Sequence, residues 1–389
     1  MMTTTMNCPD THILTLHAQS SPVAYRYAVI SDVHLGHRKT PTAETIEKLY
    51  YYLNDSVFSQ IDIFVIAGDL YDSLLDLNQE ETHEIDFWIF DLLLLAKKHG
   101  VKVWVLEGTP LHDREQSKRI VTFNQGARFQ ADVQYFDEIS IHYEPKFKQF
   151  FLFVPDEATA SPQETLVRVR ELMKDYGIEK VDCAFMHGAF KYQLPDMDSI
   201  PTHDEASYLE LVKYTISIGH VHEASSYERI FAQGSFDRLG HGTEMAKGFN
   251  VVTVYEDGTY DVVFVENKQA KIYKTINVES TDVEDSLAEI DEAVKPYPDG
   301  SHMRLRAPAT HPLLSSMDSV MRRHPSFYWI SKADKTDRKT KEASAQTRYV
   351  PIVLNEQTLT KHVIDALKTR PEIEERHLKK AEDFLASLR

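Results

Sequence analysis

The sequence predicts a layered α/β fold, followed by a smaller α+β unit. In the first two-thirds of the chain, short apolar runs alternate with segments whose apolar residues recur at i, i+3, i+4 and i+7. Polar residues of metal-ligating type follow several of these runs. From about residue 266 the order changes to strand, helix, strand, helix, strand. With 389 residues, the chain is long enough for two or three folding units.

The expected strands of the larger unit are apolar runs at 28–30, 63–67, 101–106, 184–186 and 216–218. The helices between them are predicted by their apolar faces, after Pro41 and over 85–93, with Gly100 ending the second. Ser161 and Glu164 resemble a capping box, which predicts a helix that ends at Gly177. The runs 249–254 and 260–265 are typical of a β-hairpin.

The second unit has expected strands at 271–277, 302–306 and 327–330 and helices at 283–294 and 313–323. A polar stretch with few large apolar residues follows, which is typical of a linker. Two helices with apolar stripes are predicted over 356–369 and 371–388. The predicted organisation is an N-terminal extension at 1–23, a main domain at 24–265, a small α+β domain at 266–330, a linker at 331–349 and terminal helices at 350–389.

Composition excludes several classes of protein. Acidic residues outnumber basic ones by 60 to 43, so a net basic wrapper around nucleic acid is excluded, although a locally positive groove is not. Cys8 and Cys183 are too few and too far apart for a disulfide framework or a thiolate zinc site. No apolar run approaches the ~18 residues that span a bilayer. We therefore expect a soluble, cytoplasmic protein.

Potential metal ligands follow five separate strands. They are Asp32 and His34 after the first, Asp69 after the second, His112 and Asp113 after the third, His187 at the fourth, and His220 and His222 at the fifth. The carboxyl ends of strands meet at one crevice in α/β sheets, so these side chains can converge. A mixed set of carboxylates and imidazoles suits Mn, Fe or Zn.

These motifs, DxH, GD, G…HD, a lone H and GHxH in that order, resemble the calcineurin-like metallophosphoesterase superfamily. The start SDVHLG, the segment GSFDRLGHGTEMAKGF and the small α+β unit with terminal helices resemble SbcD-type DNA double-strand-break repair nucleases, including bacteriophage members. The resemblance implies a four-layer sandwich of two mixed sheets flanked by helices, with the α+β unit as a DNA-binding capping domain.

The resemblance also implies a role for each residue. Asp32, His34 and His222 would bind one divalent metal, His187 and His220 the other, and Asp69 would bridge the two. Mn is the expected metal, with Mg, Fe or Zn as alternatives. His112 would act as the general acid, and Asp113 would orient its imidazole.

One motif departs from the family. The family has contiguous Gly-Asn-His-Asp, whose asparagine binds the second metal, whereas this chain has Gly108-Thr109-Pro110-Leu111-His112-Asp113. Thr109 is the nearest oxygen donor and thus a possible ligand, but a neutral hydroxyl is a poor substitute. The second site is therefore expected to be weaker or to be completed by water.

Other residues have more open interpretations. Candidate DNA contacts are His37, Arg238, His241 and Lys247, with a solvated histidine or structural pairing as the alternative. The apolar stripes of the terminal helices fit either a partner surface or packing on the parent domain. By resemblance, the partners would be DNA, a second copy in a homodimer, and an SbcC-like coiled-coil ATPase.

Three functions remain open on sequence grounds. The first is a dimetal DNA exonuclease or endonuclease acting in DNA repair and recombination. The second is a phosphodiesterase or phosphatase for small nucleotides or phosphoproteins, because the core chemistry is common to the superfamily. The third is a DNA-docking regulatory subunit with little turnover. The additional α+β unit favours the first, and the nearly complete ligand set argues against the third.

Overall fold

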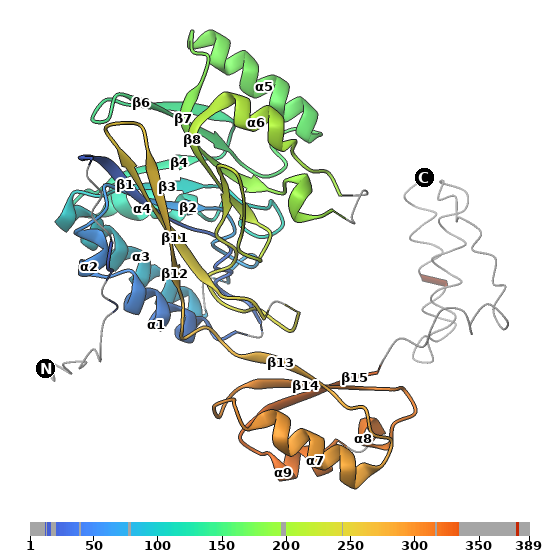
Figure 1. The fold of residues 1–389 in the computed structure, drawn as a ribbon. Helices are drawn as coiled ribbons and strands as arrows, with labels where there is room; N and C mark the ends of the chain where they lie inside the picture. Colours follow the sequence, from blue (N-terminus) through green and yellow to red (C-terminus); the bar gives the residue numbers. More distant parts are fainter. Residues whose placement is uncertain are drawn as a thin grey trace, which may run out of the picture. The chain divides into compact units, whose positions relative to one another are not determined.

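The structure is a computed structural model that describes residues 12, 14–16, 21–38, 40–76, 79–195, 200–242, 244–315, 317–333 and 379–380 (Figure 1). The chain divides into two compact units, Met1–Ala333 and Asp334–Arg389. Most of the predicted linker and nearly all of the two terminal helices lie outside the described residues. Among the described residues, no helix is long and apolar enough to cross a membrane.

The first sheet has six strands and is mixed. Its order is β12 (Tyr260–Glu266), β11 (Gly248–Tyr255), β1 (Val23–Ile30), β2 (Ile63–Ala67), β3 (Lys102–Leu106) and β4 (Asp132–Phe136). Strands β1 to β4 run parallel, whereas β11 is antiparallel to both β1 and β12. The predicted hairpin is therefore the edge of this sheet.

The second sheet also has six strands. Its order is β5 (Ser140–Glu144), β6 (Gln149–Val154), β7 (Val181–Gly188), β8 (Val212–His220), β10 (Ile230–Ala232) and β9 (Ser225–Tyr227). Strands β6, β7, β8 and β10 are parallel to one another, whereas the outer strands β5 and β9 are antiparallel to β6 and β10.

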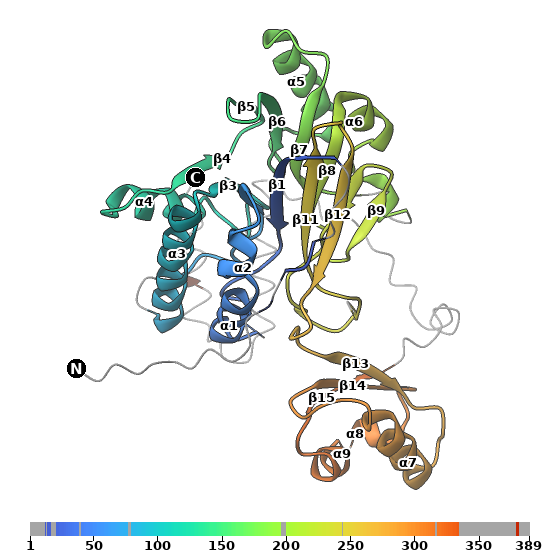
Figure 2. The same ribbon diagram turned by 60° about the vertical axis from the view of Figure 1, so that its left-hand side comes forward.

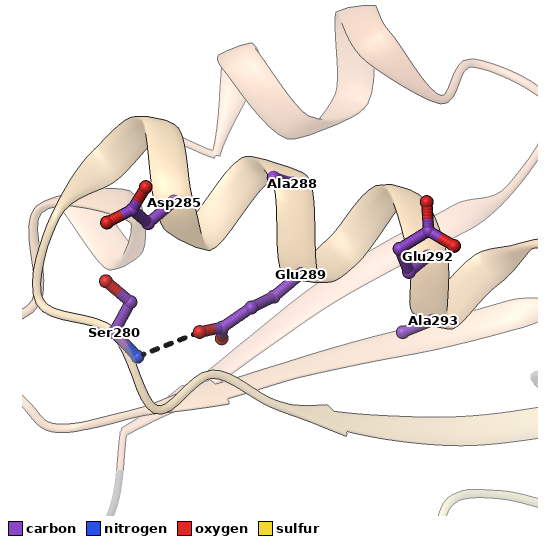
Figure 3. Close-up of a pocket in the computed structure, with 6 residues that line it drawn as sticks. All are labelled: Ser280, Asp285, Ala288, Glu289, Glu292 and Ala293. Carbon is purple, nitrogen blue, oxygen red and sulfur yellow. Dashed lines mark hydrogen bonds between the residues drawn. The ribbon is translucent and has the colours of Figure 1, made fainter.

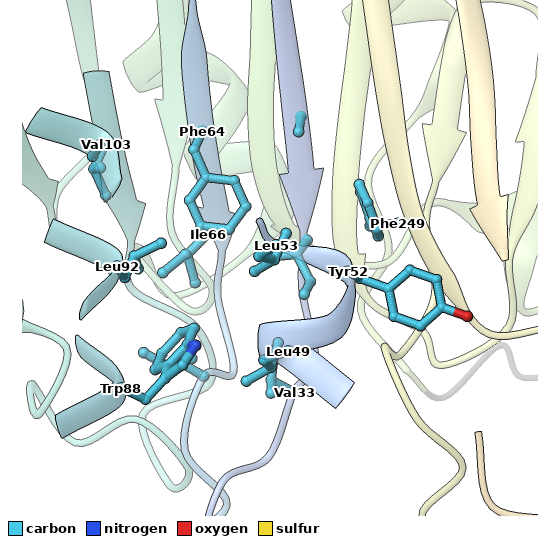
Figure 4. Packing of buried hydrophobic residues seen from close by; sticks show 14 of the residues in the cluster. Val33, Leu49, Tyr52, Leu53, Phe64, Ile66, Trp88, Leu92, Val103 and Phe249 are labelled. Atoms are coloured by element: carbon cyan, nitrogen blue, oxygen red, sulfur yellow. The ribbon is translucent and has the colours of Figure 1, made fainter. Parts of the chain in front are cut away.

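The two sheets pack face to face, with helices on both outer faces (Figure 1, Figure 2). An aromatic core lies between the sheets and includes Tyr27, Trp104 and Phe185. Helices α1 (Thr42–Tyr52), α2 (Asp55–Phe58), α3 (Glu80–His99) and α4 (Lys118–Gly126) contribute to the cluster on the outer side of the first sheet, part of which is seen in Figure 4. Helices α5 (Pro162–Asp175) and α6 (Glu205–Leu211) pack on the second sheet, and a 3₁₀ turn, η1 (Lys191–Gln193), follows β7. The prediction of two mixed sheets flanked by helices is confirmed.

Local signals in the sequence account for several helix boundaries. Gly100 ends α3 with a left-handed φ of 69°, a conformation that glycine adopts without strain. The Ser161 side chain accepts a hydrogen bond from the Glu164 amide and so caps α5, as its sequence predicts.

The small sheet belongs to the α+β unit. It consists of the parallel strands β13 (Tyr273–Asn277), β14 (His302–Ala307) and β15 (Tyr328–Ala333). One face of it packs on α7 (Val283–Val294), α8 (Pro312–Ser315) and α9 (Asp318–Arg323). The single helix predicted over 313–323 is instead two short ones. Leu313 and Val320 are both buried in this core, so their spacing does not distinguish one helix from two.

Candidate metal centre

Six histidine and aspartate side chains from both large sheets form two clusters. The first cluster is Asp32, His34 and His222, and the second cluster is Asp69, His187 and His220. Within each, the potential ligand atoms lie within 4.8 Å of one another, so each cluster can hold a metal ion. The residues follow β1, β2 and β8 or end β7 and β8, so strand ends bring together side chains that are about 190 positions apart in sequence.

Asp69 belongs to the second cluster and also faces His34 of the first. Its Oδ2 atom is 3.3 Å from Nε2 of His187 and 3.8 Å from Nε2 of His34. Nε2 of His34 in turn lies 3.1 Å from Nε2 of His222. Although burial raises the pKa of Asp69, the imidazoles of His187 and His34 and the Thr109 amide lower it well below its usual range. The carboxylate is therefore ionised and placed to contact cations in both clusters.

The orientation of His187 fits a metal ligand. Its Nδ1 lies 2.7 Å from the carbonyl oxygen of Ala67, which only accepts, so Nδ1 carries a proton and Nε2 faces Asp69. Nε2 is buried and makes no hydrogen bond of normal geometry. Burial would lower the pKa of His187, but the carboxylates of Asp69, Asp32 and Asp156 raise it well above its usual value. This environment stabilises positive charge between His187 and Asp69. A divalent cation at this position would supply that charge in place of a proton on Nε2 of His187.

Four of the six residues have a positive φ, which is uncommon for a residue with a Cβ. Asp32, His34, Asp69 and His220 have φ values of 50°, 52°, 50° and 93°. Positive φ costs a residue with a Cβ of order 1–3 kcal/mol, and such strain clusters at functional sites. The surrounding structure therefore holds these candidate ligands in place at a cost in stability.

Gly68 packs directly beneath the second cluster and gives a testable prediction. Its φ is +84°, and an added Cβ would meet Nδ1 of His187 at 2.2 Å and Cα of Gly108 at 2.7 Å. We expect Gly68→Ala to lower the free energy of unfolding by roughly 2 to 4 kcal/mol and to displace His187. Chemical denaturation and metal titration measure the two effects.

The matched control for Gly68→Ala is Gly126→Ala. Gly126 is exposed in α4, and an added Cβ would meet nothing within 4 Å. This variant should keep the stability and metal binding of the natural chain. Equal behaviour of the two variants would contradict the tight packing described at Gly68.

The sequence predicts that Asp113 orients the imidazole of His112, but Asp113 is not its hydrogen-bond partner in the loop after β3. The partner of Nδ1 of His112 is the backbone carbonyl of Asp72, at 2.7 Å. The buried Asp113 carboxylate instead accepts from the amides of Asp69, Tyr71 and Gly108, at 2.8 to 3.0 Å. Burial raises its pKa to about 7, although these amides favour the ionised form. Asp113 thus fixes the backbone that carries Asp69, and it does not orient His112.

His112 lies beside the first cluster. Its ring meets that of His34 edge-on, with centroids 4.8 Å apart, and Asp72 brings the two together. Oδ1 of Asp72 lies 3.3 Å from Nδ1 of His34, while the carbonyl of the same residue holds His112. Because Nδ1 of His112 is held by a carbonyl, its Nε2 is the nitrogen available for proton transfer.

Asp156 is a residue near the second cluster that sequence reasoning missed. It follows β6, and its Oδ2 lies 3.5 Å from Nδ1 of His220. The hydroxyl of Thr109 lies 3.1 Å from the same oxygen. The signal was present in the sequence, since an apolar run, Phe150–Val154, precedes Pro155 and Asp156, but this run was not identified as a strand.

Two of the candidate DNA contacts, Lys247 and Arg238, hydrogen-bond to backbone carbonyls; for Arg238, which is half-buried, contact with DNA stays a prediction. Lys247 is fully buried and donates from Nζ to the backbone carbonyl of His222, and burial lowers its pKa to about 8. The prediction that it contacts DNA is therefore wrong. The Arg238 guanidinium donates to the carbonyls of Ala270 and Lys271, which fastens the start of the α+β unit.

The other two candidates are half-buried. The His241 ring meets the ring of Tyr273 in β13, with centroids 5.0 Å apart. His37 lies in the loop after His34, and the pKa of the nearby Asp72 is lowered first by its hydrogen bond with His34 and then by its interaction with His37. Contact with DNA stays a prediction for both.

Comparisons with known proteins add little to this geometry. No family model and no curated protein matches the sequence. One solved crystal structure aligns with 62% of this chain and 98% of its own chain, at 12% sequence identity and a TM-score of 0.34. Similarity this low carries no argument about fold or function, so the chemistry is inferred from the clusters themselves.

Proposed function

We propose that this protein is a dimetal phosphoesterase of the calcineurin-like superfamily and, within it, a DNA nuclease of the SbcD type. The observation that carries the proposal is the convergence of Asp32, His34, Asp69, His187, His220 and His222 in two adjacent clusters. The order of these residues along the chain matches the motifs of that superfamily.

The proposed cofactors are two divalent cations, with Mn favoured because it accepts both oxygen and imidazole ligands. When bound, the pair supplies an acidified water for in-line attack on phosphorus and neutralises charge on the phosphate oxygens. Asp69 is placed to contact both cations, since one of its oxygens faces both clusters. Nε2 of His112 delivers a proton to the leaving oxygen, while Nδ1 stays fixed on the Asp72 carbonyl.

The small sheet supports a nucleic acid as substrate over a small nucleotide. In β14, Met303 and Leu305 are buried against the helices, so His302, Arg304 and Arg306 lie on the opposite face. The register places Tyr273 of β13 and Tyr328 of β15 beside His302. Their rings stack, with centroids 4.6 and 4.8 Å from the His302 ring.

This sheet face combines one exposed tyrosine ring with positive charge, whereas Tyr273 is buried. Tyr328 is 64% exposed, and Lys332 continues the face along β15. Aromatic rings beside arginine and lysine form the surface on which unstacked bases and phosphates bind. Such a platform has no evident use in hydrolysis of a small phosphomonoester.

The helical face of the same unit has the opposite charge. A hollow along α7 is lined by Asp285, Glu289 and Glu292, together with small residues (Figure 3). Like charge disfavours phosphate there, so we assign the DNA contact to the sheet face. The proposed ATPase partner and homodimer rest on the resemblance alone.

The proposal is tested by incubating the purified chain with end-labelled DNA and with a generic phosphodiester, in Mn²⁺ and in chelator. We expect both substrates to be cut in Mn²⁺ and neither in chelator. Tyr328→Ala combined with Lys332→Glu should weaken cleavage of DNA but leave cleavage of the small phosphodiester unchanged. Glu289→Gln, on the acidic face, is the matched control.

Each outcome of this test distinguishes among the candidate functions. Cleavage of the small substrate without cleavage of DNA would favour the phosphodiesterase alternative. DNA binding without turnover on either substrate would favour the regulatory alternative. His222→Ala, purified in parallel, controls for contaminating nucleases, because loss of a ligand of the first cluster should remove activity that belongs to this chain.

A further inference from the structure

The Thr109 hydroxyl lies among more acceptors than its single proton can satisfy. Its Oγ1 is 3.2 Å from Oδ2 of Asp69, 3.1 Å from Oδ2 of Asp156 and 3.3 Å from Nδ1 of His220. A hydroxyl donates one hydrogen bond, so at least one carboxylate oxygen faces it without a proton between them. A positive charge nearby would stabilise carboxylate oxygens that face one another in this way.

The backbone fixes Thr109 in this place. Its amide donates to Oδ1 of Asp69 at 2.6 Å, and Gly108 before it packs so closely that an added Cβ would lie 2.1 Å from the Asp69 amide. The Thr109 hydroxyl therefore lies beside Asp69 and His220 of the second cluster, but it is a neutral group on a shorter side chain than the asparagine of the family. The hydroxyl is placed to position a neighbouring carboxylate.

Asp156 supplies that carboxylate. The residue follows β6, which is hydrogen-bonded to β7, the strand that ends in His187 and Gly188. The side chain is 15% exposed, and its Oδ1 accepts from the Glu157 amide at 3.0 Å. The other oxygen, Oδ2, is thereby left to face Thr109 and His220.

Asp156 lies outside the three residues whose ligand atoms are all within 4.8 Å of one another, but its distance from His220 suits two ligands of one ion. Atoms bound at about 2.1 Å to the same cation lie about 3 to 3.5 Å apart at tetrahedral or octahedral angles. Oδ2 of Asp156 and Nδ1 of His220 are 3.5 Å apart. The negative field of Asp156 also reaches His187, the other imidazole of the second cluster.

We propose that Asp156 is a ligand of the cation in the second cluster and that it takes the place of the asparagine missing from the loop after β3. The Thr109 hydroxyl holds Asp156 in position. This assignment rests on the proposed dimetal function. It gives the second site two carboxylates and two imidazoles, so a hard divalent cation is bound more strongly than by a neutral amide.

The test is calorimetric titration of the full chain with Mn²⁺, combined with Mn²⁺ electron paramagnetic resonance. The natural chain should bind two ions with the spectrum of a coupled pair. Asp156→Ala should bind the second ion about 10-fold to 100-fold more weakly, and its spectrum should no longer be that of a coupled pair. Asp156→Asn supplies an amide like that of the family. Its affinity for the second ion should lie between that of the natural chain and that of Asp156→Ala, and its nearly unchanged shape preserves folding.

Glu157→Gln is the matched control. It removes a negative charge from an exposed side chain that is the immediate neighbour of Asp156. If it weakens binding as much as Asp156→Ala does, or if Asp156→Ala still binds two coupled ions with unchanged affinity, the ligand assignment is overturned. If the natural chain binds no Mn²⁺, the dimetal function itself fails, and the ligand assignment fails with it. The two failures are thus distinguishable.

Discussion

Asp69→Asn should reduce metal-dependent hydrolysis by a factor of about 10² to 10³ or more while the fold is retained. The carboxylate faces both clusters through a single oxygen, Oδ2, so losing its charge would affect both of the proposed cations at once. Asparagine has nearly the same shape, and Oδ1 of Asp69, which accepts from the Thr109 amide, is replaced by an amide oxygen that also accepts. Initial rates on a generic phosphodiester across Mn²⁺ concentrations measure the loss.

The control for Asp69→Asn is Asp175→Asn, which removes one negative charge from the exposed end of α5. Its rate should equal that of the natural chain. Normal hydrolysis by Asp69→Asn, with two ions still bound, would show that this residue does not bridge the two clusters. A parallel thermal melt excludes unfolding as the cause of any loss.

The residues of the two clusters could be predicted because their signals are local. Asp32 and His34 lie two positions apart directly after an apolar run. His220 and His222 have the same spacing after a second apolar run. Strand ends of an α/β fold converge, so five such signals in one chain are enough to predict a single site. Asp156 was not predicted, because the apolar run before it was not identified as a strand. Its position directly after that run nevertheless follows the same rule.

Roles that depend on distant contacts could not be predicted from local pattern. Nothing around Lys247 in the sequence indicates that it is buried and bound to the carbonyl of His222, 25 positions away. The pairing of His112 with the Asp72 carbonyl, in place of Asp113, depends on how two loops meet, 40 positions apart. Three residues, Thr109 to Leu111, stand between Gly108 and His112 where the family has a single asparagine, so the family motif does not fix the geometry of this loop.

His112→Ala should lower turnover by about 10² to 10⁴, with little change in Mn²⁺ affinity. Nδ1 is held by the Asp72 carbonyl, so only Nε2 can give a proton to the leaving oxygen. His34 makes its own contact with the Asp72 carboxylate and should keep its orientation without His112. Substrates with a good leaving group need less protonation, so the loss should be much smaller for an activated ester than for DNA.

Leu111→Ala is the matched control for His112→Ala, since Leu111 is its neighbour in the same loop and is 72% exposed. It should leave both turnover and metal affinity unchanged. The competing role for His112 is that of a ligand, because it also forms a group with His34 and Asp72 whose atoms lie within 4.8 Å of one another. A large drop in Mn²⁺ affinity in His112→Ala, with equal losses on activated and unactivated esters, would assign it to the metal instead of to proton transfer.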